Sequence, residues 1–185
     1  MSISGAEAQR SATQRDLEAT PDDGNLWEVI DGRIYVTPQA TVAHQNVVTQ
    51  LTGILNAHVR RHGLGKVFTS SIKVVLDEPT GVGPDIVFIS TARLDGLRDD
   101  GFYGAPDLIV EVLSSKPALD RIVKRDRYAR AGVPEYWIAD PVQRTLEAYT
   151  LKGDRYELVA QRSEAERFEP PPFPGLVVEL VDLWL

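Results

Sequence analysis

The spacing of apolar positions changes several times along the chain, and each change predicts a new element. Between Thr41 and His62 the apolar residues recur at helical spacing, and Gly63 follows as a natural C-terminal cap. This segment is therefore expected to form an amphipathic helix. Before it, two short strands flank Asp31-Gly32. Such a dipeptide accepts the positive φ angles of a two-residue hairpin turn, so we predict a β-hairpin here.

After the first helix the apolar period becomes two, which is typical of strands. A second helix is expected over 114–132, with Gly132 at its end and Pro134 just beyond. The predicted strands around it are VFTSSIKVVL (67–76), PDIVFI (84–89), PDLIVEVLS (106–114), EYWIAD (135–140), TLEAYTL (145–151) and DRYELVA (154–160). This order predicts an α/β fold with a mixed β-sheet rather than an alternating doubly wound one.

Length and composition are those of one globular domain, with 185 residues of which 43% are hydrophobic and 25% charged. We expect a polar N-terminal tail or irregular first turn over 1–20 and a single domain over 21–185. The absence of cysteine excludes disulfides and thiolate metal sites. No apolar run approaches the ~18 residues of a membrane span, and the first residues lack the apolar core of a signal peptide. A cytoplasmic protein with no membrane partner is the expectation.

The net charge of −7 argues against an indiscriminate nucleic-acid binder, which is usually basic. The charge is unevenly distributed, however. Residues 116–130 contain six basic and two acidic side chains, which gives this segment a charge of +4 on an acidic body. A local surface that faces phosphate groups is therefore possible on the second helix.

Carboxylates interrupt two of the apolar strands. Asp85 opens one strand, and Glu111 lies deep within another, where an unpaired charge is costly to bury. Glu111 could lie at a sheet edge or form an internal ion pair, but geometry favours a site. If the two strands are antiparallel neighbours, Asp85 faces Glu111, whereas Asp107 lies four residues, roughly 13 Å, along the strand. Asp107 is then expected to order the turn after Pro106. Two carboxylates at adjacent strand ends are typical ligands of Mg²⁺.

The second helix places Asp120, Lys124 and Tyr128 on one stripe at i, i+4 and i+8. Lys124 is expected to project away from the apolar face of the helix and to reach the mouth of the carboxylate pair. Hydrolysis of a phosphodiester requires positive charge near the phosphate oxygens, which Lys124 could supply. An ordinary solvated lysine paired with Asp120 is the alternative.

With these residues identified, the chain from about Trp27 to the C-terminus resembles the Uma-type family of restriction endonucleases, within the PD-(D/E)XK nuclease superfamily. Each motif is weak alone, but their order and spacing together are quite specific. The motifs are WEVIDGRI, His44, GPDIVFI, PDLIVEVLS, Asp120-x3-Lys124-x3-Tyr128, GVPEYWIADP and FPGLVVEL. The resemblance implies a restriction-endonuclease-like core, in which a central mixed sheet is flanked by helices.

The resemblance also implies site residues. Asp85 and Glu111 correspond to the metal-binding acids, with Mg²⁺ or Mn²⁺ as cofactor. Leu113 occupies the position of the usual lysine, and the resemblance suggests that Lys124 has taken over its role. Glu28 and His44 are supporting candidates.

The resulting hypothesis is an Mg²⁺-dependent endonuclease that hydrolyses phosphodiester bonds in DNA. Arg121, Arg125 and Arg127 would position phosphates without reading bases. A nuclease fold kept as a weak or inactive binding module of a mobile-element or defence system is one alternative, and an enzyme acting on a small phosphoester is another. A homodimer would suit double-strand cleavage, with the apolar 177–185 as its interface, although that segment could equally close the core. The sequence leaves DNA specificity, biological role and oligomeric state open.

Overall fold

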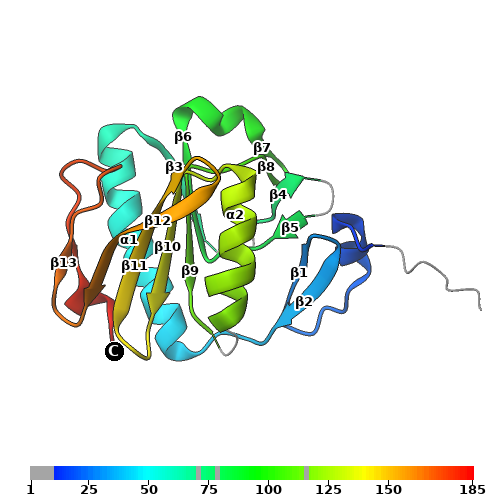
Figure 1. Ribbon diagram of the computed structural model, residues 1–185, viewed down its shortest axis with the longest axis horizontal. Helices are drawn as coiled ribbons and strands as arrows, with labels where there is room; N and C mark the ends of the chain where they lie inside the picture. The colour runs from blue at the N-terminus through cyan, green and yellow to red at the C-terminus, as the bar shows by residue number, and fades with distance from the viewer. Residues whose placement is uncertain (1–10, 70–71, 78–79, 115–116) are drawn as a thin grey trace, which may run out of the picture.

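The computed structural model describes residues 11–69, 72–77, 80–114 and 117–185. Two six-stranded sheets form the framework, and two helical segments lie on opposite faces of the larger sheet (Figure 1). The expected α/β class with a mixed sheet is confirmed. No helix among the described residues is long and apolar enough to cross a membrane.

The larger sheet contains the two strands that carry the predicted acids. Its strand order is β12-β11-β10-β9-β6-β3, and the β9–β10 pair is parallel while the other pairs are antiparallel. Ile86 pairs with Val110, which is the antiparallel arrangement expected from the sequence. The strands are β3 (Gly65–Thr69), β6 (Ile86–Ser90), β9 (Leu108–Val112), β10 (Glu135–Asp140), β11 (Thr145–Lys152) and β12 (Arg155–Ser163).

The smaller sheet contains the predicted hairpin. Its order is β2-β1-β5-β4-β8-β7. Asp31 and Gly32 have φ angles of 48° and 75°, so both turn residues adopt the left-handed conformation that the dipeptide favours. The strands are β1 (Leu26–Ile30), β2 (Arg33–Thr37), β4 (Val74–Asp77), β5 (Thr80–Val82), β7 (Leu97–Arg98) and β8 (Gly101–Tyr103). A 3₁₀ helix over Thr91–Gly96 connects β6 to β7.

Helix α1 (Val42–His62) has the predicted bounds and caps. The Thr41 side chain accepts a hydrogen bond from the backbone N–H of His44, and Gly63 closes the helix with φ of 64°. Its apolar stripe, including Leu51 and Leu55, packs against one face of the larger sheet in the main core. The second core lies on the other face, beneath α2 and the smaller sheet.

The second helix differs from the regular helix expected over 114–132. Leu119–Lys124 is a π-helix that continues directly into α2 (Arg125–Ala131), and Gly132 ends it with φ of 80°. Residues 115 and 116 lie outside the described part of the chain. The wider π winding, frequent at functional sites, shifts the side chains of this segment from the positions that a regular helical period assigns.

The prediction of a single strand over 67–76 is wrong, because this segment contributes to two different strands. Its first part is β3 in the larger sheet, and its last part, beyond the undescribed residues 70–71, is β4 in the smaller sheet. An alternating pattern reports only which side chains are buried, not which strand is the partner.

Both ends of the described chain pack on the domain. The 3₁₀ helix Gln14–Ala19 lies within the segment expected as a tail, and Ala12 donates a backbone hydrogen bond to Gly32. At the other end, β13 (Arg167–Phe168), β14 (Val178–Glu179) and the 3₁₀ helix Leu180–Leu183 close the main core. Leu180 and Leu183 are fully buried in this core, whereas Val181 and Leu185 of the same apolar segment are exposed, so a dimer interface there stays a prediction.

Candidate active site

The register of β6 and β9 brings Asp85 to Glu111. Asp85 comes one residue before Ile86, and Glu111 one residue after its partner Val110. The carboxylate of Asp85 accepts a hydrogen bond from the backbone N–H of Val112 at 2.8 Å. This bond fixes the predicted acid against the strand that carries the second one.

Lys124 connects this sheet to the hairpin. Its Nζ atom lies 3.2 Å from Oε1 of Glu111 and 3.0 Å from Oε2 of Glu28, which β1 contributes. Asp120, one turn earlier, is 3.5 Å from the same nitrogen. Three carboxylates from three separate elements therefore surround one ammonium group.

The expectation that Lys124 projects toward the mouth of the site is wrong, because its side chain is only 3% exposed. The sequence pattern placed it opposite the apolar face, but the hairpin covers that side and supplies Glu28. A lysine at this depth is tolerated because carboxylates meet it directly.

Electrostatics in this cluster are dominated by burial and by an excess of acids. Burial by itself would lower the pKa of Lys124, but attraction to Glu111, Glu28 and Asp120 raises it well above its ordinary value. Burial raises the pKa of Glu111 strongly, against the attraction of Lys124, and raises that of Asp120 to about 6. The ammonium is charged at neutral pH, and the cluster has more carboxylates than it can neutralise.

Tyr128 and His44 hold the two acids in place. The Tyr128 hydroxyl donates to Oε1 of Glu111 at 2.7 Å, and burial raises the pKa of this phenol well above its ordinary value, so it keeps its proton. His44 Nε2 lies 3.2 Å from Oδ2 of Asp85. Each predicted acid thus has a partner from a helix, Glu111 from α2 and Asp85 from α1.

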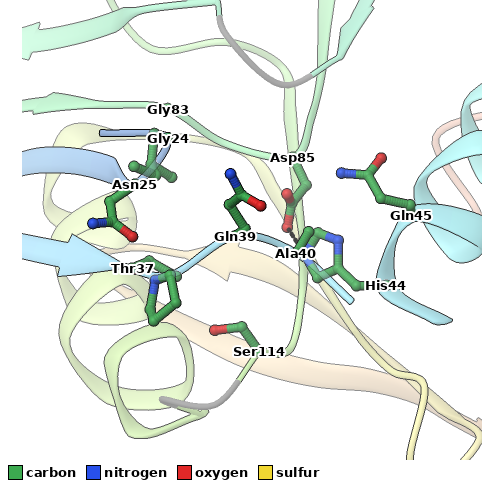
Figure 2. A pocket seen from close by; sticks show the side chains of 12 residues that line it. Gly24, Asn25, Thr37, Gln39, Ala40, His44, Gln45, Gly83, Asp85 and Ser114 are labelled. Carbon is green, nitrogen blue, oxygen red and sulfur yellow. Dashed lines mark ion pairs between the residues drawn. The ribbon is translucent and has the colours of Figure 1, made fainter. Parts of the chain in front are cut away.

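The site opens at a cavity of about 400 Å³, and Asp85 and His44 line it. Figure 2 shows these two side chains in contact, with Gln39, Gln45 and Ser114 around the same space. Glu28, Glu111 and Lys124 do not line the cavity and lie more deeply buried. Asp85 is therefore the acid that a ligand in the cavity meets first.

Carboxylate oxygens are the donors that Mg²⁺ prefers, and Mg²⁺ requires few of them because it retains several waters. Asp85 and Glu111 fit that chemistry, and the excess of negative charge around Lys124 favours an additional cation. Among the described residues, no group of three or more histidine, cysteine, aspartate or glutamate side chains is assembled as a metal cage. A Mg²⁺ ion at this site would therefore be held by Asp85 and Glu111, with water molecules as its remaining ligands.

Asp107 is not brought to this cluster. Its carboxylate accepts a hydrogen bond from the backbone N–H of Ser90 at 2.7 Å and lies 3.4 Å from Arg93. Because it sits at the opposite end of the β6–β9 pair, it orders a loop, as the sequence argument for a turn anticipated. The structure therefore does not bring Asp107 together with the other predicted site residues.

The three arginines expected to bind phosphate have different surroundings. Arg121 pairs with Glu147 at 2.6 Å and lies 3.6 Å from Asp140. Arg127 is 5% exposed and pairs with Asp31 and Asp77, so it does not present a phosphate-facing surface. The positive charge seen in the sequence is neutralised by acids that come from other elements.

Arg125 differs from the other two. Its guanidinium lies 5.4 Å from the centre of the Tyr149 ring, and it has no acidic partner within the described ranges. Phosphate binding therefore stays a prediction for Arg125, which is the one of these three arginines without an acidic partner among the described residues.

The Arg127 contacts hold the hairpin against the second helix, and their removal should be measurable. Arg127→Ala is expected to lower the free energy of unfolding by about 1–3 kcal/mol, because ion pairs with Asp31 and Asp77 and a hydrogen bond to Thr80 are lost. Arg130→Ala is the matched control. It also removes a contact with Asp31, but at a 50% exposed side chain, so less than about 1 kcal/mol is expected. If urea denaturation shows the same loss of unfolding free energy for Arg127→Ala and Arg130→Ala, the buried role of Arg127 is contradicted.

Asp120 should make stability depend on pH. Since its pKa is raised from 3.8 to about 6, the folded state keeps a proton that the unfolded state releases. Stability contributed by that proton is present at low pH and is lost as the pH rises from about 4 to 6. Asp120→Asn should reduce this decline by about 2–3 kcal/mol in urea denaturation at pH 4 and pH 7. Asp126→Asn, on the exposed side of the same helix, is the control, and parallel curves for wild type and Asp120→Asn would refute the assignment.

Comparison with known proteins identifies the family. The chain matches the sequence model of Uma2, described as "Putative restriction endonuclease", over residues 15–181. The chain belongs to the Uma2 family. The resemblance found in the sequence motifs is therefore confirmed.

A solved structure supports the restriction-endonuclease-like fold of this Uma2 chain. A protein of Anabaena variabilis, described as "a putative nuclease belonging to DUF820", superposes with a TM-score of 0.75 at 20% sequence identity. The match covers 92% of this chain and 96% of that one. No curated protein sequence matches the chain.

Sequence reasoning missed part of the site. Asp120 and Tyr128 were recognised on the Lys124 stripe, but the hydrogen bond from Tyr128 to Glu111 was not expected, because that requires knowing how the helix packs on the sheet. Gln39 lines the cavity from a segment without apolar periodicity, and Ser114 stands at the end of a predicted strand, so no pattern marked either as a site residue. Glu28 carried a signal, an acid within an apolar strand, and belongs to the cluster.

Proposed function

We propose that this Uma2 protein is a metal-dependent nuclease that hydrolyses phosphodiester bonds in DNA. The observation that supports it most is the meeting of Asp85 and Glu111 at facing strand ends with Lys124 beside them. Family membership supports nuclease activity in general terms. The metal, the DNA substrate and the residue roles are the parts that experiment must test.

Asp85 and Glu111 would hold Mg²⁺ or Mn²⁺. The bound ion would lower the pKa of a coordinated water and offset charge on the phosphate. Lys124 keeps a fixed positive charge next to Glu111, and Tyr128 holds the same carboxylate by its hydrogen bond. Glu28 and Asp120 fix the position of the lysine.

His44 is placed to handle a proton. It contacts Asp85 at the cavity wall, and the ring nitrogens of an imidazole can accept or donate a proton. A group at this position can exchange a proton with a water molecule or with a leaving oxygen in the cavity. His44 is therefore proposed to act at the open side of the site and Lys124 at its buried side.

The test is incubation of purified protein with supercoiled plasmid in Mg²⁺, in Mn²⁺ and in EDTA. Nicked or linear product with either metal, and none in EDTA, is the expected result. Cleavage that persists in EDTA would contradict the metal requirement. Absence of cleavage by folded protein, together with salt-sensitive DNA binding that needs no metal, would support the alternative of a binding module.

A further inference from the structure

The cavity beside Asp85 has an unusual lining for a site that meets nucleic acid. Its wall comes from the start of β1, the 37–40 connection, the first turn of α1 and the loop before β6. At about 400 Å³ it is within the range of small-ligand pockets. It shares Asp85 and His44 with the candidate active site, so any substrate that reaches Asp85 must occupy or border it.

The charge of the lining disfavours a phosphate as the occupant. Among the described residues of the wall there is no lysine or arginine, and the ionisable side chains are Asp85 and His44. A phosphate group placed in the cavity away from a metal ion held by Asp85 and Glu111 would meet no cationic side chain among the described lining residues. The occupant expected on electrostatic grounds is therefore a neutral part of the substrate.

The polar groups of the lining are neutral amides and hydroxyls. Gln39 and Gln45 are both exposed, and neither side-chain amide has a hydrogen-bond partner in the part of the chain that is described. Figure 2 shows them on either side of Asp85. Gly24 leaves room for Gln39, since a Cβ there would lie 2.5 Å from the Gln39 amide nitrogen.

The apolar part of the lining completes the chemistry. Leu26, Pro38 and Ala40 offer surface to the face of a ring, while the amides offer a donor and an acceptor to its edge. Glutamine amides pair with the edges of nucleobases, and apolar side chains can enclose the faces of an unpaired base. A planar heterocycle with polar edges fits this combination better than a sugar or a phosphate.

We propose that the cavity binds the base of an unpaired nucleotide next to the bond to be cut. The preferred substrate is then single-stranded or locally unpaired nucleic acid, because a base within a duplex cannot leave its stack without an energetic cost. This inference rests on the proposed nuclease function, whose substrate it narrows. Gln39 and Gln45 are the residues that recognise the base.

The experiment measures binding by fluorescence anisotropy in EDTA, so that no cleavage intervenes. Probes are a labelled single-stranded oligonucleotide, its duplex, and the same strand with consecutive abasic sites. The single strand is expected to bind at least about tenfold more tightly than the duplex or the abasic strand. The double variant Gln39→Ala/Gln45→Ala should lose that advantage and retain its affinity for the abasic strand.

Gln50→Ala, an exposed glutamine further along α1, is the matched control and should bind like wild type. Thermal unfolding of each variant shows whether the fold is kept. Equal affinity for all three probes, no binding to any, or an equal loss on the abasic strand in the double variant would each overturn the inference. Cleavage of plasmid by a protein that binds all three probes equally would refute the inference and leave the nuclease proposal standing. Tighter binding of the single strand than of the abasic strand, without cleavage in any metal, would support the inference about the cavity and contradict the nuclease proposal.

Discussion

Replacing Glu111 by glutamine is expected to reduce metal-dependent cleavage at least about 100-fold while leaving the protein as stable as the wild type or more so. Activity falls because glutamine lacks the charge that holds a cation, and loss of even an indirect metal contact costs about 10–100-fold. Stability does not fall, since burial raises the pKa of Glu111 strongly and the neutral amide avoids that cost. The amide oxygen can still accept the Tyr128 hydrogen bond.

The measurements are plasmid nicking rates in Mg²⁺ and the midpoint of urea unfolding at pH 7. Glu147→Gln is the control, because Glu147 is a similarly buried acid that pairs with Arg121 outside the cluster. It should cleave at the wild-type rate. Wild-type cleavage by Glu111→Gln would exclude Glu111 from the chemistry, whatever the result for stability.

Lys124→Met should be the most destabilising of these single substitutions. Methionine keeps much of the length of the side chain but leaves Glu28, Glu111 and Asp120 without their shared ammonium. Removal of one partner from a buried ion pair typically costs about 3–5 kcal/mol, and that loss is expected at pH 7. It should shrink toward pH 5, where carboxylates with raised pKa values take up protons.

A double-mutant cycle separates this charge effect from a simple packing defect. In Glu111→Gln/Lys124→Met one of the unpaired carboxylates is absent, so the loss of stability should be smaller than the sum of the single losses. Strictly additive losses would show that the two side chains do not interact. Lys66→Met, at an exposed lysine on β3, should change neither stability nor cleavage.

Much of the fold follows from local patterns. Helix α1 and the hairpin turn have their predicted bounds because their caps and turn residues act over a few positions. The antiparallel pairing of β6 and β9 entered the sequence argument as a condition for bringing Asp85 to Glu111, and the structure has that pairing. The division of 67–76 between two sheets was not predictable, because strand partners are chosen by packing far along the chain.

In the candidate site, too, the residues could be recognised from local sequence but their packing partners could not. Asp85, Glu111 and Lys124 were recognisable as acids and a base at conspicuous positions, but their surroundings were not. The burial of Lys124 depends on Glu28 from the hairpin, about a hundred residues earlier. Arg127 likewise forms its ion pairs with Asp31 and Asp77, which lie about fifty to a hundred residues earlier in the chain. Ion pairs between distant segments leave no periodic signal.

The origin of Glu28 in a separate hairpin has a consequence for local unfolding. Glu111 lies on β9, which has hydrogen-bonded neighbours on both sides in the larger sheet. Among the described residues, the pair that joins strand β1 to the rest of the smaller sheet is Val29–Gly81, apart from the pairing of β1 with its hairpin partner β2. Amide protons of the hairpin should therefore exchange with solvent sooner than those of β9, in a partial opening that releases Glu28. Glu111 would then become exposed only when the whole fold opens, whereas Glu28 would be released by local unfolding of the hairpin alone.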